Sequence, residues 1–277
     1  MTLLAGELGW PAHQRIKVES WRGSEHLSQE DDIAEEAPIA LVYNGEPHVV
    51  MLATPLDLED FALGFSLTEG IVSTPDAVES IRVFTRSEGI EVRLKIPEAC
   101  CNRLADKGRN LTGRTGCGLC GAITLSQAIR RSPPVGPGVR VQSSELLAAL
   151  GVLKSHQRLN QLTGAVHAAA WAVPGKGICC LREDVGRHNA LDKLMGVLAR
   201  SQTDFAAGYV LVTSRASYEM VQKCTAMGVS LMAAISAPTG LAVRMARDAG
   251  LTLLGFARDD RYLVYSHPAR ILHTDDE

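Results

Sequence analysis

The chain has 277 residues, of which 46% are hydrophobic and 5% aromatic, enough for one large or two small globular domains with ample core. Its formal net charge of -3 provides no positive field that would attract nucleic acid, and no window is apolar and long enough to span a membrane. Its seven cysteines, an odd number, and a start without a basic, apolar leader favour the cytoplasm over a disulfide-bonded secreted protein.

The N-terminal part begins with a polar stretch. Residues 1–37 are rich in acidic side chains, and we expect a loosely held tail that leads into the first strand. After it, residues 38–43 and 47–53 flank Asn44-Gly45, a dipeptide typical of a type I′ turn. These features predict a β-hairpin directly after the tail.

A helix and a further strand follow the hairpin. Thr54 is expected to cap a helix with Pro55 at its first position, and the helix should stop at Gly70. Residues 90–96 alternate between apolar and polar, which predicts a strand with one face in water. Residues 38–131 therefore read as a small mixed α/β subdomain.

This subdomain ends in a loop that carries two thiols. In the stretch 113–121, Cys117 and Cys120 are three positions apart among glycines and follow Arg114. Such a C-x-x-C pair can cycle between redox states, hold a metal, or carry sulfur. The glycines leave both sulfurs uncovered, and the nearby guanidinium favours the reactive thiolate.

The C-terminal part, residues 139–277, follows the linker 132–138, which is rich in proline and glycine. Ser143 is expected to cap its first helix. Strands and helices then alternate, with strands expected at 177–181, 208–213, 229–235 and 251–256 and helices at 188–200, 214–228 and 238–249. The alternation predicts a mostly parallel sheet with helices on its faces.

Polar loops follow several of these strands. In open α/β sheets, ligands bind beyond the carboxyl ends of the strands, where helix N-termini present free N–H groups to anions. The loops in question are 183–190, 213–215, 236–239 and 257–261. Each loop alone could hold only helix caps and solvated arginines, but their shared position at one edge predicts a pocket for a phosphorylated ligand.

Seven segments together resemble the formate dehydrogenase accessory sulfurtransferase family, FdhD/NarQ. They occur in the family's order, and the match runs from about Ile33 to His267. The segments are 43–45, 61–66, 113–121, 161–164, 167–171, 183–188 and 214–223.

The resemblance implies a fold similar to that of cytidine deaminases and a function in sulfur transfer. Members of the family take persulfide sulfur from a cysteine desulfurase and pass it to molybdenum bis(molybdopterin guanine dinucleotide), or its tungsten counterpart, for formate dehydrogenase. By this resemblance Cys117 would bear the persulfide and Cys120 would assist or resolve it. The implied partners are a cysteine desulfurase and the catalytic subunit of formate dehydrogenase. Paired sites for a doubly guanylated cofactor suggest a homodimer.

The resemblance also implies which residues contact the guanine dinucleotide. The loop of the last strand falls where the family is described as binding it, and two further loops at the strand ends would add phosphate contacts. The candidates are Ala257, Arg258, Asp259, Asp260, Arg261, Tyr262, Arg187, His188, Ser214 and Arg215. The two aspartates are unusual beside phosphates, but a carboxylate can accept the N–H donors of a guanine ring.

Residues 167–169, His-Ala-Ala, argue against deaminase activity. Cytidine deaminases hold zinc through a His-x-Glu motif and a Pro-Cys-x-x-Cys pair. Here alanine replaces the acid, and residues 214–217 contain no cysteine where the pair would be expected. We therefore expect His167 to be a pocket or core residue, and we expect the scaffold to bind rather than deaminate.

Three alternatives to the sulfur carrier remain. A zinc site would need Cys100 or Cys101 beside the C-x-x-C pair, and their adjacency does not match usual ligand spacing, so we expect no resident metal. A thioredoxin-like oxidoreductase would place the thiols between a strand and a helix in a smaller fold. A non-catalytic chaperone that delivers the cofactor would need the same pocket but not the cysteines.

Overall fold

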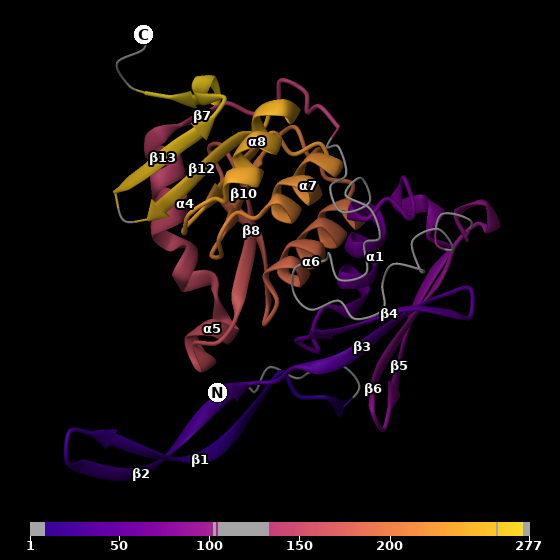
Figure 1. Cartoon of the computed structure of the whole chain (residues 1–277), viewed down its shortest axis with the longest axis vertical. Helices are drawn as coiled ribbons and strands as arrows, with labels where there is room; N and C mark the ends of the chain where they lie inside the picture. The colour runs from indigo at the N-terminus through magenta and orange to yellow at the C-terminus, as the bar shows by residue number, and fades with distance from the viewer. Residues whose placement is uncertain (1–8, 102–103, 105–132, 259, 274–277) are drawn as a thin grey trace.

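The computed structural model describes residues 9–101, 104, 133–258 and 260–273, and Figure 1 shows their arrangement. The elements of the N-terminal part are β1 (His13–Arg22), β2 (Glu25–Ala34), β3 (Ala37–Tyr43), β4 (Glu46–Ala53), α1 (Leu58–Thr68), the 3-10 helix η2 (Pro75–Ala77), β5 (Ser80–Arg86) and β6 (Gly89–Lys95).

The elements of the C-terminal part begin with β7 (Val141–Gln142), α4 (Ser143–His156), α5 (Arg158–Thr163), β8 (His167–Val173), β9 (Gly177–Asp184) and α6 (Arg187–Arg200). They continue with β10 (Tyr209–Val212), α7 (Tyr218–Ala226), β11 (Leu231–Ala234), α8 (Gly240–Ala249), β12 (Thr252–Arg258), β13 (Arg261–Ser266), η3 (Pro268–Arg270) and β14 (Ile271–Leu272). None of the described helices has the length and apolarity needed to cross a membrane.

A four-stranded sheet in the order β4-β3-β6-β5 forms the N-terminal part and packs one face against α1. The predicted hairpin is present, because Asn44 and Gly45 both have positive φ, 51° and 94°, as a type I′ turn requires. The predicted strand at 90–96 is β6, whose alternate residues lie in the core with α1.

A six-stranded sheet in the order β13-β12-β11-β10-β8-β9 forms the C-terminal part. Its central strands β10, β11 and β12 run parallel, whereas β8, β9 and β13 pair antiparallel. Helices α6, α7 and α8 cover one face and α4 covers the other (Figure 1). The α/β fold with helices on both faces of the sheet is therefore confirmed, but the sheet is mixed rather than mostly parallel, because only two of its five strand pairings are parallel.

Two expected helix caps are replaced by other contacts. Helix α1 begins at Leu58 rather than at Thr54, because the groups of Thr54 bind the C-terminal part, its N–H donating to Asp184 at 3.0 Å. The hydroxyl of Ser143 lies 2.6 Å from that of Tyr262 and caps nothing. Thr54 and Ser143 thus make contacts with residues distant in the sequence, which a local sequence pattern does not predict.

The stretch expected as a loose tail contains a regular hairpin. Strands β1 and β2 pair over ten residues each, and Figure 1 shows them projecting from the body. Opposite charges across the strands, such as Arg15 and Asp32 at 2.7 Å, support the pairing. The acidic composition that suggests a tail is therefore the charged face of a β-hairpin.

Helices α1 and α6 join the two parts by backbone contact. A Cβ atom on Gly64 would lie 1.7 Å from the Asp192 carbonyl oxygen, and one on Gly196 would lie 1.9 Å from the Asp60 carbonyl oxygen. Side chains larger than hydrogen are excluded at both positions, so the helices cross at a distance that only glycine permits.

Replacing Gly196 with alanine should separate these helices. We expect Gly196→Ala to lower the free energy of unfolding by about 1–3 kcal/mol, as in overpacked cores, measured by denaturant titration. Gly151→Ala on α4 is the matched control, because nothing lies within 4 Å of its Cβ position and alanine favours a helix. Equal stability of the two variants would contradict the close crossing.

Candidate functional site

The predicted thiol pair lies outside the described residues, and only its surroundings can be given. Cys117 and Cys120 fall within 105–132. Before this stretch, Cys101 lies at the surface of the N-terminal core, where Asn44 Nδ2 is 3.2 Å from its sulfur. After it, Pro133 lines a large cavity.

Two of the predicted loops, those after β10 and β11, converge at one edge of the sheet, and the start of β8 lies beside them. The Thr213 hydroxyl after β10 accepts a hydrogen bond from the Ala168 N–H at 2.9 Å, which ties the start of β8 to the end of β10. The loops after β10 and β11 are joined through a bridge between Ala216 and Pro238. The first residue of β8, His167, therefore lies at the same edge as these loops.

Two helix N-termini meet at this edge. Helix α6 begins at Arg187 and α7 at Tyr218, and neither has a side-chain cap. The His188 ring on α6 lies 2.8 Å from the Glu219 carboxylate on α7 and 3.4 Å from the Ser217 hydroxyl. The first turns of both helices are thus held together, with N–H groups of the kind that bind anions.

Positive charge collects around these N-termini. The Nε atom of Arg187 is buried without a hydrogen-bond partner among the described residues. Burial lowers the pKa of His167, and the positive charges of Arg187 and His188 lower it further, so its ring stays neutral near pH 7. Burial acts to raise the pKa of Glu219, but the hydrogen bond and charge of His188 outweigh it and hold that pKa below its usual range.

A buried network that sequence reasoning missed holds the start of α6. Lys193 and Asp184 are both fully buried and form an ion pair at 2.7 Å. The same carboxylate accepts the Gly186 N–H at 2.7 Å and the Asn189 amide at 3.0 Å. Lys193 also donates to the Thr54 carbonyl at 2.9 Å. The only sequence signal was the run of polar residues at 183–189, which we assigned to ligand binding.

The two other predicted residues after β10 differ in accessibility. Ser214 is buried, and its hydroxyl donates to the Arg215 carbonyl at 3.0 Å. Arg215 is exposed, and its guanidinium group makes no hydrogen bond or ion pair to another described residue. Only the arginine is therefore available to a ligand.

The loop of the last strand forms a separate part of the edge. Arg258 and Arg261 are exposed and face each other across the β12–β13 turn, with Asp260 beside them. Ala257 is buried in the core under α4, and the Tyr262 hydroxyl contacts that helix. Asp259 lies outside the described residues.

This turn is distant from the α6 and α7 N-termini. Strands β11 and β10 lie between β12 and β8. At about 4.8 Å per strand spacing, the β12–β13 turn is therefore about 14 Å from the start of β8 and the residues beside it. One phosphate cannot contact both groups. An extended ligand such as a dinucleotide could reach both.

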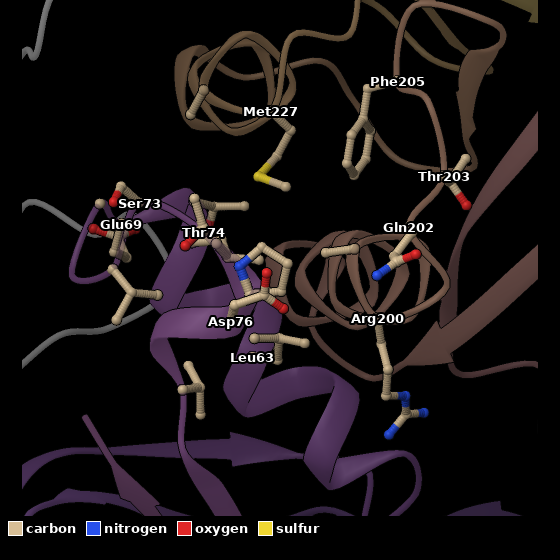
Figure 2. Close-up of a pocket in the computed structure, with 18 of the residues that line it drawn as sticks. Leu63, Glu69, Ser73, Thr74, Asp76, Arg200, Gln202, Thr203, Phe205 and Met227 are labelled. Atoms are coloured by element: carbon tan, nitrogen blue, oxygen red, sulfur yellow. The ribbon is translucent and has the colours of Figure 1, made fainter. Parts of the chain in front are cut away.

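A large cavity lies at the opposite end of α6 and α7. A cavity of about 1180 Å³ opens where α6 ends, between the chain after α1 and the C-terminus of α7 (Figure 2). Leu63, Phe205 and Met227 give it an apolar wall, and Asp76 and Gln202 are polar groups on its lining. Its walls come from segments far apart in the chain, so no sequence pattern marks it.

We call His167, Arg187, His188 and Glu219, at the N-termini of α6 and α7, the strand-end cluster. The 14 residues of α6 separate the cavity from this cluster by about 21 Å. The two features are therefore distinct sites. Within the described ranges, no three His, Cys, Asp or Glu side chains come together as a metal site. The expectation of no resident metal stays a prediction, since the thiol pair is outside these ranges.

Comparison with known proteins gives a consistent result. The model of the FdhD/NarQ family matches residues 34–272. The sulfur carrier protein FdhD of Cupriavidus necator is 52% identical over 269 residues, covering 97% of this chain and 93% of the relative. That of Bordetella petrii is 51% identical over 244 residues, covering 88% of each.

A solved structure has the same fold. It is the crystal structure of a protein from Desulfotalea psychrophila assigned as a formate dehydrogenase accessory protein. It superimposes with a TM-score of 0.74 at 22% identity and covers 95% of this chain and 100% of that one.

Removing the charge of Arg187 should change the titration of His167. Because the pKa of His167 is lowered in the folded chain, the unfolded chain binds a proton at a higher pH than the folded chain does. The contribution of His167 to the free energy of unfolding is therefore complete above pH 6.5 and declines as the pH falls below that value. In Arg187→Ala we expect the His167 pKa to rise toward 6.5, measured by NMR titration. Arg22→Ala, on the projecting hairpin, should leave it unchanged. An identical titration in both variants would show that Arg187 does not face His167.

Proposed function

Because the chain belongs to the FdhD/NarQ family, we propose that it is a sulfur carrier required for formate dehydrogenase activity. The observation that carries the proposal is the match of relatives named sulfur carrier protein FdhD to nearly the whole chain, up to 97% of it. In this proposal Cys117 accepts sulfur from a cysteine desulfurase and delivers it to molybdenum bis(molybdopterin guanine dinucleotide), or its tungsten counterpart, which is the substrate.

The sulfur transfer can be written with two thiol exchange steps. The Cys117 thiolate attacks the outer sulfur of the desulfurase persulfide, whose sulfur–sulfur bond breaks as the donor thiolate leaves. The Cys120 thiolate then attacks the inner sulfur of the Cys117 persulfide. A disulfide forms between the two cysteines, and the outer sulfur departs toward the cofactor as hydrosulfide with the bonding electron pair. A dithiol reductant restores both thiols.

The strand-end cluster supports a phosphate contact for the nucleotide part of the substrate. Two uncapped helix N-termini, the unpartnered Nε of Arg187 and the His188 side chain all lie there. Arg215 is exposed on the neighbouring loop. The helix N-termini and the guanidinium groups favour an anion, whereas the His188 ring is already paired with the Glu219 carboxylate.

The β12–β13 turn supports contacts to a second part of the nucleotide. Arg258 and Arg261 could bind a phosphate, and the carboxylate of Asp260 could accept the N1–H and N2–H donors of guanine. Asp259 is proposed for the same role from the sequence alone. Ala257 and Ser214 are buried, so we expect them to support the loops at this edge of the sheet rather than to contact the ligand. The Tyr262 hydroxyl is bonded to Ser143 of α4.

The proposed partners follow from the chemistry. A cysteine desulfurase would load the thiol and the formate dehydrogenase catalytic subunit would receive the mature cofactor. A homodimer would provide two nucleotide sites for a cofactor that carries two guanine nucleotides. These events are proposed for the cytoplasm, where thiols stay reduced.

Three measurements separate the alternatives. Incubation with a desulfurase and cysteine, followed by intact mass spectrometry, should add one sulfur to the carrier and none to a non-catalytic cofactor chaperone. A structural zinc site would instead give stoichiometric metal that is lost with the thiol pair. A thioredoxin-like oxidoreductase would show disulfide cycling without a sulfur adduct.

Cys117→Ala should abolish activation of formate dehydrogenase in cells that lack the wild-type gene. The reason is that no other residue of the proposal forms the persulfide. Folding and nucleotide binding should be unchanged, and Cys224→Ala, which alters a fully buried thiol, is the control for loss of a cysteine. Undiminished activation by Cys117→Ala would remove the persulfide mechanism.

GDP, a fragment of the guanine dinucleotide, should bind more tightly than ADP. A site that hydrogen-bonds guanine donors leaves its carboxylate unpaired when adenine replaces guanine. Arg187→Ala should weaken GDP by roughly ten- to a hundredfold, since a charge-assisted hydrogen bond contributes about 1.5–3 kcal/mol. Calorimetry is the measurement, with Arg22→Ala as control. Equal affinity for the two nucleotides would disprove guanine recognition without touching the role of Cys117.

A further inference from the structure

Strands β1 and β2, residues 13–34, form an arm that leaves the body of the molecule (Figure 1). At ten residues per strand the arm is about 33 Å long. Only its base is packed, where Ala12, Leu159 and Val166 form a small core with Ala34. An isolated two-stranded hairpin is at best marginally stable in water. The arm therefore needs a surface that covers one of its faces.

The charged side chains on one face of the arm pair with each other within the hairpin. On that face Arg15 pairs with Asp32 at 2.7 Å, His26 contacts Glu19, and Trp21 stacks on the His26 ring at 4.4 Å. These charges already have opposite partners, so this face has no need of another surface.

The other face carries the uncovered aliphatic side chains of the arm among polar residues. Residues directly opposite each other in an antiparallel pair share a face. The register places Ile16, Val18, Leu27 and Ile33 on this face. Leu27 is 61% exposed, Ile33 39% and Ile16 38%. We call this set the apolar arm face.

A second uncovered apolar surface lies on the four-stranded sheet, on the side away from α1. There Val50 is 62% and Leu52 54% exposed, and the register puts them beside Ala40 and Pro38 on β3. Arg93 on β6 lies on the same side of the sheet. We call this set the outer sheet face.

The two surfaces are complementary in charge. By register the apolar arm face includes the carboxylates of Glu25 and Asp31 and one guanidinium, that of Arg22 opposite Glu25. The outer sheet face includes the guanidinium groups of Arg82 and Arg93 and one carboxylate, that of Glu91, which binds Arg93 at 2.7 Å. Among these groups the arm face has a net negative charge and the sheet face a net positive charge, so opposite net charges would meet when the apolar residues pack together.

The arm cannot reach the outer sheet face of its own chain. Strand β2 runs into β3 through residues 35 and 36 alone, and two residues span at most about 7 Å. The Glu35 N–H is also bonded to the Ala12 carbonyl at 3.0 Å, which fixes the base. A second copy of the chain is the nearest source of the same surface.

We propose that two copies of this chain exchange arms, each apolar arm face packing on the outer sheet face of the other copy. A face about 33 Å by about 10 Å provides roughly 330 Å². Two arms on two sheets would bury about 1,300 Å² in total, within the range of specific interfaces. The arrangement is isologous and closes with two-fold symmetry. It assigns a contact surface to the homodimer of the proposed function and does not depend on the chemistry of Cys117.

The test is the association state of the full chain by analytical ultracentrifugation. Wild type should be dimeric. The arm variant Ile16→Lys with Leu27→Lys should raise the dimer dissociation constant at least about a hundredfold, as loss of interface anchors does. The sheet variant Val50→Glu with Leu52→Glu should do the same. Val152→Lys, at a 45% exposed residue of α4, is the matched control and should stay dimeric.

Mixing the arm variant with the sheet variant should restore a dimer. The mixed pair contains one unaltered contact, and the other contact sets lysines against glutamates. Circular dichroism would show that each variant is folded. A monomeric wild type, dimers that persist in both variants, or a mixture that stays monomeric would each overturn the proposal.

Discussion

Helices α1 and α6 cross with their backbones in contact, and the positions of both candidate sites depend on this crossing. Gly64 and Gly196 make the approach possible, since any Cβ atom there would overlap a carbonyl oxygen of the facing helix. Because α6 starts at the strand-end cluster and ends at the large cavity, the crossing fixes both ends of that helix relative to the N-terminal sheet (Figure 1). A shift of α1 would therefore move the cavity wall and the start of α6 relative to the N-terminal sheet.

Buried lysines make the arrangement of helices at this junction specific. Lys193 contacts Asp184 beneath the start of α6, and Lys223 on α7 contacts Asp192 of α6 through both carboxylate oxygens at 2.9 Å. Burial acts to lower the pKa of Lys223, but Asp192 and Glu69 outweigh it and raise the pKa, so the ammonium stays charged. Such pairs add little net stability, yet removing one partner costs about 3–5 kcal/mol because a charge is left buried alone. The junction therefore tolerates only one arrangement of α1, α6 and α7.

The sequence predicts the parts of this molecule whose patterns are local. The Asn44-Gly45 turn, strand β6 and the alternation of helices with the strands β10 to β12 follow from turn chemistry and hydrophobic periodicity, and the structure has them. The expected caps at Thr54 and Ser143 fail because each hydroxyl-bearing residue is used by a distant partner. The β1–β2 hairpin was missed because cross-strand charges resemble the composition of a tail. The cavity was missed because no segment alone forms it.

The strand-end cluster shows why this scaffold suits binding better than proton transfer. The topology brings two helix N-termini and the start of β8 to one edge, which any ligand with phosphates could use. Residue Ala169 lies where a neighbouring acid would be needed beside His167, and burial with adjacent cations keeps that histidine neutral. Glu219 is held ionised by His188 and so is a poor proton donor near pH 7. Persulfide exchange needs only a thiolate and a leaving thiolate, without a general acid at the nucleotide end. A site that holds anions and moves no proton is therefore sufficient for the proposed sulfur carrier.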